Sequence, residues 1–361
     1  MKIKNLNTRK LSAIVLAIVL VCSATAGAAL AASPAPSLVF ASAGRTAGSA
    51  AEVYAQNVNS TVAINVSAVT SMFGYDAVTD GSGSGFIITD DGYILTNFHV
   101  VDGAEKIEVE MYDGDKYKAE LIGYDDSNDI AVLKIDATGL NPVTFADSDS
   151  IAVGDTVYAV GNPLGELDFT MTTGMVSALD RTITTEENYV PINMFQIDAA
   201  VNPGNSGGPV YNAAGQVIGV VTAKTSATGV EGLGFAVPAN DAVNIANELM
   251  ENGFVVSRVQ LGITTRTLSS SAARYYGQAA GVYVVAVNEG SCAEAAGLKP
   301  GDIIAGVSGK DTPTYEALKT VLRGYAPGDE VELTIYRNDE EVTLTVALDA
   351  ADETSPNNQQ H

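Results

Sequence analysis

Three observations on the sequence predict a mainly β protein with two folded units. Between Ser60 and Val237, short runs rich in β-branched residues, such as STVAINVSAV and QVIGVVTA, alternate with Gly, Asn and Asp. No helical period separates these runs, which favours an all-β barrel or sandwich over a parallel α/β sheet. From Arg258 to Leu348, strand-like runs are interleaved with two short helical segments, which indicates a smaller unit of mixed α and β structure.

The amino terminus has the pattern of an export signal. Basic residues within the first ten positions precede an apolar run, and small residues follow it up to Ala29-Leu30-Ala31. This order is typical of a cleavable signal peptide. The uncharged stretch from Leu11 to Ala32 is also long enough to span a bilayer, so residues 1–31 are expected to be either a signal peptide or a membrane anchor. We therefore expect the folded part to work outside the cytoplasm, in the cell envelope, as a periplasmic or secreted protein.

Composition and helix signals set the remaining boundaries. Residues 32–51 are mainly Ala, Ser, Gly and Pro, which predicts a flexible linker. The segment NDAVNIANELMENG has helical spacing and a glycine stop, so a first domain is expected over residues 52–253. The second domain is expected over 258–348. Within it, Thr312-Pro313 predicts a helix start before TYEALKTVLR, and the polar residues 349–361 are expected to form a disordered tail.

Charge and cysteine content disfavour several classes of partner. The chain has 43 acidic against 19 basic residues, a formal net charge of −24, so we expect neither nucleic acid nor an anionic membrane surface as a partner of the folded part. Its two cysteines, Cys22 and Cys292, cannot form an intramolecular disulfide once the signal is cleaved. No cluster of His, Cys and carboxylates has the spacing of metal ligands, so no metal or cofactor is expected.

The stretch NPGNSGGPV places a lone serine, Ser206, among three glycines. A surface turn between two strands is one interpretation. The other is a nucleophile whose neighbouring glycines let backbone amides converge beside the hydroxyl, as an oxyanion hole requires. A serine nucleophile also needs an adjacent base and a third group that orients that base. The second interpretation therefore depends on residues elsewhere in the chain.

His99 is the only histidine before the final residue, so it is the only histidine available as that base; a purely structural histidine is the alternative. Among nearby aspartates, Asp129 opens the core run DIAVLKI, where an unpaired charge is costly and an imidazole N–H would relieve that cost. An aspartate that bonds local amides is the alternative there.

GNSGG also fits the nucleophile elbow of α/β-hydrolases, but in those enzymes the histidine follows the serine, and here only His361 does. The order His99, Asp129, Ser206 fits the two-barrel serine protease arrangement.

Several linked motifs resemble those of one family. TNFHVV, NDIAVLKI and GNSGGPV, together with GSGSGFIIT, AVGNPLG and GLGFAVP, resemble the HtrA/Deg family of exported serine proteases, and the chain from Arg258 onward is similar to its PDZ domain. The match covers roughly residues 52–348 in order. It implies a chymotrypsin-like double β-barrel protease domain followed by a small α/β PDZ domain. It also implies a serine endopeptidase in which His99 is the general base, Asp129 orients it and Ser206 attacks the scissile carbonyl.

The resemblance also assigns binding residues. It implies an oxyanion hole formed by the backbone amides of Gly204, Asn205 and Ser206. It implies a specificity pocket that includes Asn202, Leu233 and Phe235. Since Leu233 and Phe235 are apolar, a small or medium aliphatic residue is expected before the cleaved bond. The carboxylate-binding loop of the PDZ domain is expected at Gln260, Leu261, Gly262 and Ile263.

The resemblance further implies a role and partners. Unfolded or misfolded envelope proteins would be degraded without ATP, in protein quality control, and carboxyl-terminal peptides would bind the PDZ domain. A homotrimer is implied, with contacts around Val53 and Tyr54, and the loop from Asp180 to Pro191 takes the position of a sensor loop that couples the two domains. The alternative is a chaperone or peptide-binding module whose triad residues are idle.

Overall fold

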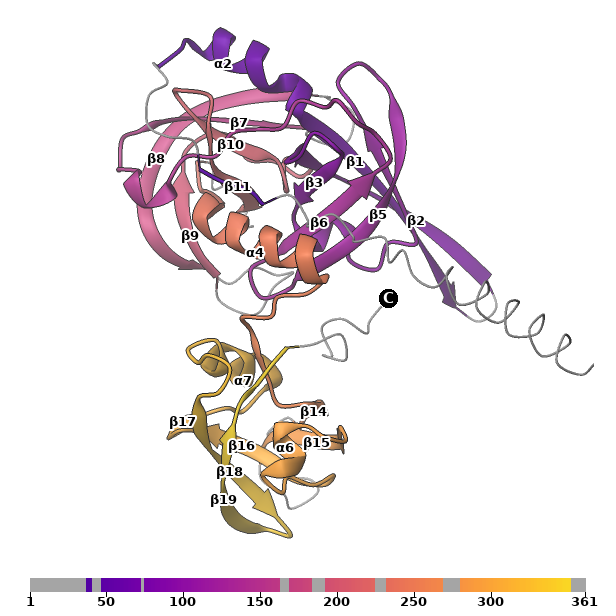
Figure 1. Cartoon of the computed structure of the whole chain (residues 1–361), viewed down its shortest axis with the longest axis vertical. Coiled ribbons are helices and arrows are strands. Elements are labelled where there is room, and N and C mark those ends of the chain that lie inside the picture. The colour runs from indigo at the N-terminus through magenta and orange to yellow at the C-terminus, as the bar shows by residue number, and fades with distance from the viewer. Residues whose placement is uncertain are drawn as a thin grey trace, which may run out of the picture. The chain divides into compact units, whose positions relative to one another are not determined.

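The structure is a computed structural model of the chain, and it describes residues 37–40, 47–72, 75–162, 169–183, 192–224, 232–268 and 280–351. The expected export signal, most of the linker and the end of the tail lie outside these ranges. The described residues form two closed six-stranded barrels and a third, mixed unit (Figure 1). The mainly β fold predicted from the sequence is thereby confirmed. No helix within these ranges is both long and apolar enough to cross a membrane.

The first barrel consists of antiparallel strands in the order β1-β2-β3-β6-β5-β4. The strands are β1 Thr61–Met72, β2 Tyr75–Ile87, β3 Tyr93–Thr96, β4 Lys106–Glu110, β5 Lys116–Asp125 and β6 Ile130–Ile135. Alternate residues point inward, so aliphatic side chains such as Ile64, Ile94 and Leu133 fill the barrel and are fully buried. A four-residue helix, α3 Phe98–Val101, follows β3 at the barrel rim.

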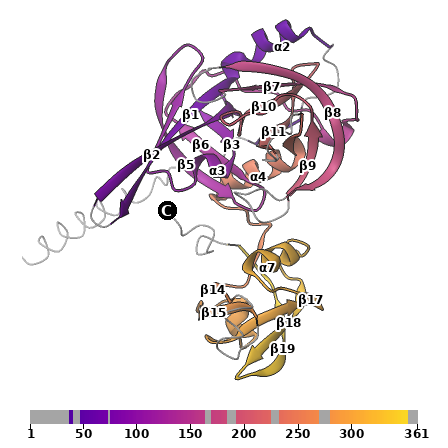
Figure 2. The same ribbon diagram turned by 180° about the vertical axis from the view of Figure 1, so that it is seen from behind.

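The first two strands form a hairpin that is longer than the barrel needs. Thr61 pairs with Phe86 at one end of the hairpin and Met72 pairs with Tyr75 at the other. β4 pairs with β1 only as far as Ser67, so the distal half of the hairpin extends beyond the barrel in both views (Figure 1, Figure 2). The protein therefore has an extended two-stranded arm beside the rim that carries α3.

The second barrel has the strand order β10-β11-β12-β9-β8-β7. Its strands are β7 Thr156–Gly161, β8 Thr170–Ile183, β9 Ile192–Ile197, β10 Pro209–Asn212, β11 Val217–Lys224 and β12 Gly234–Pro238. The expected helix follows as α4 Ala239–Asn252, and it ends at Gly253, whose φ of 82° supplies the left-handed cap. The apolar face of α4 is buried and contacts both β6 and β11, so this helix covers strands of both barrels.

Short helices precede each barrel. They are α2 Ala50–Asn57, the 3-10 turn η1 Val58–Ser60 and the 3-10 turn η2 Ser148–Ser150. Ser49 caps α2 through a reciprocal pair of bonds with Glu52, which satisfies amides at the helix start. The Tyr54 hydroxyl donates to the Phe169 carbonyl at 2.8 Å, and Val53 is only 2% exposed. These contacts dock α2 onto its own chain.

Within the described residues 258–268 and 280–351, the third unit has a six-stranded sheet, two helices and a short strand pair. The sheet order is β14-β15-β16-β18-β19, with β17 on β16. Its elements are β14 Ile263–Leu268, β15 Gly281–Val287, α6 Cys292–Ala295, β16 Ile303–Val307, β17 Lys310–Asp311, α7 Tyr315–Leu322, β18 Glu330–Arg337 and β19 Glu340–Ala347. The strand pair consists of β13 Val259–Gln260 and β20 Asp349–Ala350.

Two expectations for this unit require correction. Helix α7 is capped by Thr314, whose side chain accepts from the Ala317 amide, and not by Thr312. Thr312 is fully buried and its amide donates to the Ala305 carbonyl, so it belongs to the strand region. The tail expected to be disordered from residue 349 instead begins with β20, because Asp349 and Ala350 pair with Gln260 and Val259. Residues 352–361 lie outside the described ranges.

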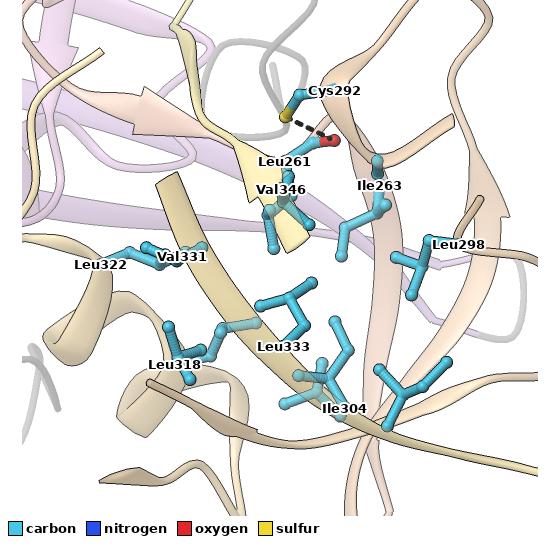
Figure 3. Packing of buried hydrophobic residues seen from close by; sticks show 14 of the residues in the cluster. Leu261, Ile263, Cys292, Leu298, Ile304, Leu318, Leu322, Val331, Leu333 and Val346 are labelled. Atoms are coloured by element: carbon cyan, nitrogen blue, oxygen red, sulfur yellow. Dashed lines mark hydrogen bonds between the residues drawn. The ribbon is translucent and has the colours of Figure 1, made fainter. Parts of the chain in front are cut away.

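The core of the third unit is one cluster of buried aliphatic side chains between α7 and the sheet. Figure 3 shows Leu318 and Leu322 of α7 beside Leu333 and Val331 of β18. Cys292 lies at the edge of this cluster, where its thiol donates to the Gln260 carbonyl at 3.3 Å and lies 3.7 Å from the Leu261 carbonyl oxygen. Burial raises the pKa of the Cys292 thiol to about 11.

We predict that Cys292 resists alkylation in the folded protein. A thiol with a pKa of about 11 is a thiolate in roughly one molecule in a thousand at pH 8, and the thiolate is the reactive form. In the variant Cys22→Ser, where Cys292 is the only thiol, iodoacetamide labelling followed by mass spectrometry should be slow at pH 8. The same protein in guanidinium serves as the control and should label fully. Equal rates in the two conditions would contradict the buried position of the thiol.

Candidate active site

His99 and Asp129 lie in direct contact at the rim of the first barrel. His99 is on α3, and Asp129 immediately precedes β6. The Asp129 carboxylate places Oδ2 2.7 Å from His99 Nδ1, and Oδ1 accepts from the His99 backbone amide at 2.9 Å. Because one carboxylate holds both the ring and the backbone of the same residue, the imidazole has a defined orientation. Nδ1 is the nitrogen that bonds Asp129, so Nε2 is the nitrogen that can exchange a proton with another group.

The backbone of Asp129 is unusual for a residue with a side chain. Its φ is 57°, in the left-handed region that non-glycine residues seldom adopt, and the residue is only 3% exposed. Its carbonyl accepts a hydrogen bond from Asn97 Nδ2 at 2.7 Å. A buried aspartate in this conformation is held from both ends, through its carboxylate and through its carbonyl.

Ser206 lies on a tight turn where the two barrels meet. The Asn205 amide donates to the Asn202 carbonyl at 3.0 Å, and Gly204 has a φ of 96°, as the third residue of a type II turn requires. The Ser206 hydroxyl donates to the Thr222 carbonyl of β11 at 3.2 Å. The Ser206 carbonyl accepts from the Ser84 amide of β2 at 2.8 Å. The serine is therefore bonded to a strand of each barrel.

The turn leaves two of the three expected amides without an acceptor among the described residues. In the part of the chain that the structure describes, the amides of Gly204 and Ser206 have no hydrogen-bond acceptor. The Asn205 amide, expected as a third donor, is already used within the turn, so it is not available to an oxyanion. Two amides on either side of one residue are the usual composition of an oxyanion hole in two-barrel proteases.

Ser84 holds this turn in place, a role that the sequence motif GSGSGF did not reveal by itself. Its hydroxyl donates to the Gly204 carbonyl at 2.6 Å and accepts from the Asn162 amide at 2.8 Å. Ser84 is fully buried. Because Ser84 bonds the Gly204 carbonyl and the Asn202 carbonyl accepts from the Asn205 amide, the Gly204–Asn205 peptide cannot rotate freely.

His99 and Ser206 line one open cleft with a volume of about 450 Å³. One wall comes from the long hairpin and includes Val66 and Thr79, and the other comes from residues 201–204 of the second barrel. Asn202, expected in the specificity pocket, lies on this second wall. The cleft has the size and the open form that an extended peptide needs.

The other two residues assigned to the specificity pocket do not line this cleft. Phe235 is buried in β12 at 5% exposure, and Leu233 is half-buried just before that strand. Residues 225–231, which precede them in the chain, lie outside the described ranges. The structure therefore places His99, Ser206 and Asn202 on one cleft, with Asp129 bonded to His99, and the specificity pocket stays a prediction.

The residues expected to form the PDZ loop line a separate groove, to which the first barrel contributes Ser127 and the rest of the lining comes from residues 257–325. Gln260, Leu261, Gly262 and Ile263 face Tyr315, Leu318 and Leu322 of α7 across it. Gly262 has a φ of 67°, and a Cβ at this position would collide with the Ser291 side chain. Only glycine fits at this turn without strain or a clash.

Two parts of the chain match known protein families. Residues 83–220 match the family described as a trypsin-like peptidase domain, and residues 259–348 match the PDZ domain family. The chain is 42% identical over 290 residues to the serine protease Do-like HtrA of Bacillus subtilis, which covers 76% of this chain and 64% of that protein. It is 42% identical over 269 residues to a probable periplasmic serine endoprotease DegP-like of Halomonas elongata, covering 74% of this chain and 56% of that protein. The chain thus spans about three fifths of the length of these relatives.

Solved structures resemble the chain over almost their whole length. An HtrA-type protease, AlgW, with a decapeptide has a TM-score of 0.58 at 32% identity, and the match covers 84% of this chain and 99% of that one. A serine endoprotease from Yersinia pestis has a TM-score of 0.55 at 32% identity, with 85% and 100% of the two chains covered. The likeness therefore includes both the barrels and the third unit.

We predict that Gly207→Ala destabilises the barrels because no space exists for a Cβ. Gly207 has a φ of 82°, and a Cβ there would collide with the Ser84 carbonyl and the Thr96 hydroxyl. Left-handed strain and over-packing together should lower the free energy of unfolding by about 2–4 kcal/mol. Gly114→Ala is the control, since Gly114 has a φ of 91° but no neighbour within 4 Å, so only the strain applies. If calorimetry gave the same loss of unfolding free energy for both variants, the packing argument would be contradicted.

Proposed function

This chain belongs to the HtrA/Deg family of serine proteases, and from that premise we propose that it is an ATP-independent serine endopeptidase that cleaves unfolded or misfolded polypeptides outside the cytoplasm. The observation that carries the proposal is the contact of 2.7 Å between Asp129 and His99 beside the cleft that Ser206 lines. A positioned imidazole next to a serine in an open cleft is the arrangement that activates a hydroxyl as a nucleophile.

The geometry supports the following sequence of steps. The Ser206 hydroxyl turns from the Thr222 carbonyl toward His99 Nε2, which takes its proton as Oγ attacks the scissile carbonyl carbon. The carbonyl oxygen becomes an oxyanion, which the Gly204 and Ser206 amides stabilise, each contributing about 3 kcal/mol to the transition state. Asp129 stabilises the imidazolium. His99 then gives the proton to the leaving amine, and water hydrolyses the acyl-enzyme by the same route in reverse.

The cleft favours unfolded polypeptides as substrates. Its lining consists largely of small and aliphatic residues, such as Ala68 and Val201, and in the proposal an extended segment lies between the hairpin and residues 201–204. A folded protein would have to release such a segment before it could enter. Small or medium aliphatic residues before the cleaved bond are part of the proposal, and they rest on the apolar character of Leu233 and Phe235.

The third unit acts as a PDZ domain that binds carboxyl-terminal peptides. A peptide adds as a strand beside β14 and faces α7, while the amides around Gly262 receive its terminal carboxylate. The apolar side chains of Leu318 and Leu322 provide the surface for the last side chain of the peptide. Quality control of envelope proteins is the role that follows from a protease joined to such a module.

Location and assembly complete the proposal. The amino-terminal signal pattern and the periplasmic relatives support work outside the cytoplasm, with residues 1–31 either removed or kept as an anchor.

A homotrimer with contacts around α2 is proposed from the family. Val53 is buried against its own chain, so Tyr54, which is half-buried, is the better candidate for a subunit contact. A mass measurement in solution that finds a stable monomer would refute the proposed homotrimer.

We predict that a fluorophosphonate labels Ser206 and that Ser206→Ala abolishes both labelling and the cleavage of casein. Only a serine activated by a base reacts with this probe, and loss of the half-buried hydroxyl removes one atom and one hydrogen bond, which should leave the protein folded. Ser82→Ala is the matched control, since Ser82 lines the same cleft and should label normally. His99→Ala should also lose labelling. An unlabelled but folded wild-type chain would favour the alternative of a peptide-binding or chaperone module.

We predict that truncation after Gly253 leaves a protease that cleaves short peptides but no longer responds to free carboxyl-terminal peptides. The proposed triad and the cleft lie before this residue, whereas the residues that line the groove lie after it with the exception of Ser127. Coupling through the loop from Asp180 to Pro191 is part of this prediction, although residues 184–191 lie outside the described ranges. Peptide activation is expected to amount to about 5–150-fold in the full chain. Equal activation of the truncated protein would remove the regulatory role of residues 258–348.

A further inference from the structure

We propose that Asn97 is a positioning residue that ties Asp129 of the first barrel to β11 of the second, and so keeps the triad aligned across the two barrels. The inference rests on the proposed serine protease function. Asn97 lies between β3 and α3, two residues before His99, and is fully buried. Asn97 is part of neither apolar core. Its side-chain amide instead makes polar contacts to residues of both barrels.

The side-chain amide of Asn97 uses both of its N–H groups. Nδ2 donates to the Asp129 carbonyl at 2.7 Å and to Thr222 Oγ1 at 2.9 Å. Two donors on one nitrogen are available from an asparagine or glutamine amide, whereas aspartate, leucine and serine side chains cannot supply both. The two bonds therefore require a side-chain amide, which Asn97 supplies.

The bond to Asp129 supports a backbone conformation that the site needs. Asp129 has a φ of 57°, and this turn of the chain aims its carboxylate at both the amide and the ring of His99. A left-handed aspartate relaxes easily unless neighbouring bonds hold it. Asn97 holds the carbonyl end of the same residue. Loss of that bond would let the carboxylate shift away from Nδ1 without removing any triad residue.

The bond to Thr222 links this arrangement to the nucleophile. Thr222 is 3% exposed, its Oγ1 accepts from Asn97, and its backbone carbonyl accepts from the Ser206 hydroxyl at 3.2 Å. One residue of β11 thus contacts both the nucleophile and the residue that holds the aspartate. Asp129 and Ser206 come from different barrels, and this short chain of hydrogen bonds sets the distance between them.

The remaining polar atom of Asn97 argues against a purely structural amide. Its Oδ1 is buried, and among the described residues it has no hydrogen-bond partner. A buried acceptor without a partner destabilises a fold, and such groups tend to mark functional sites. An apolar side chain of the same size would suit the core better, so the two donated bonds are what the position requires.

Two near-isosteric variants test the proposal. Asn97→Leu removes both donors, and Thr222→Val removes the acceptor while leaving the β11 backbone in place. For Asn97→Leu we expect kcat on a peptide substrate to fall about 100-fold, since a shift of about 1 Å in a catalytic group has that effect, with KM within about twofold. Thr222→Val, which loses one of the two bonds, should lose about tenfold. The double variant should lose no more than Asn97→Leu alone.

The pH profile supplies a readout that a structural role would not change. An imidazolium that has lost its aligned carboxylate is less stable, so the acid limb of kcat/KM should move to lower pH in Asn97→Leu. Asn247→Ala is the matched control, because Asn247 bonds both backbone groups of Leu38 far from the cleft, and its activity and pH profile should be unchanged. Circular dichroism checks that each variant is folded.

The outcomes separate the positioning role from the proposed function. An unaltered protein that neither cleaves nor labels would refute the protease function and the positioning role with it. If the unaltered protein is active, while folded Asn97→Leu keeps its kcat and pH profile within about twofold, only the positioning role is wrong. If Asn97→Leu does not fold, Thr222→Val decides, and unchanged kcat in that variant overturns the proposal.

Discussion

The candidate active site depends on hydrogen bonds that cross from one barrel to the other. Ser84 of β2 donates its amide to the Ser206 carbonyl at 2.8 Å and its hydroxyl to the Gly204 carbonyl at 2.6 Å. These bonds join the first barrel, which carries His99 and Asp129, to the turn of the second barrel that carries Ser206. Each barrel has its own closed sheet and apolar core, so neither could fix the distance between the two halves alone. Polar contacts at the junction do this, and they are buried, where each bond is stronger than in water.

The same junction explains the glycines around the nucleophile. A Cβ on Gly208 would collide with the Val160 carbonyl, and one on Gly161 would crowd the side chains of Ser84 and Asn205. The strands therefore approach closely only where side chains are missing. Gly204 has a different role, because its φ of 96° allows the tight turn that precedes Ser206. Close packing and a left-handed backbone are two separate demands on one short motif.

The groove of the third unit shares its residues with the core of that unit. Leu318 and Leu322 of α7 line the groove and also belong to the buried cluster shown in Figure 3. The loop at the end of the groove is supported by the end of the chain, since Asp349 accepts from the Cys292 amide at 2.6 Å and Gln260 donates to the Ala350 carbonyl at 3.0 Å. A peptide in the groove would therefore contact side chains that also stabilise the fold, so binding should stabilise this unit by mass action.

Much of the architecture follows from the sequence by itself. The β-branched runs specify strands, the helical period up to Gly253 specifies α4, and the scarcity of histidine singles out His99, because these features depend on local periodicity and residue chemistry. Only the tertiary structure decided which backbone and side-chain groups are joined by hydrogen bonds. The turn geometry engages the Asn205 amide, strand pairing continues into Asp349 and Ala350, and long-range bonds join Asn97 to Asp129 and Thr222. Such contacts connect residues far apart in the chain, and their geometry depends on barrel closure and not on any local pattern.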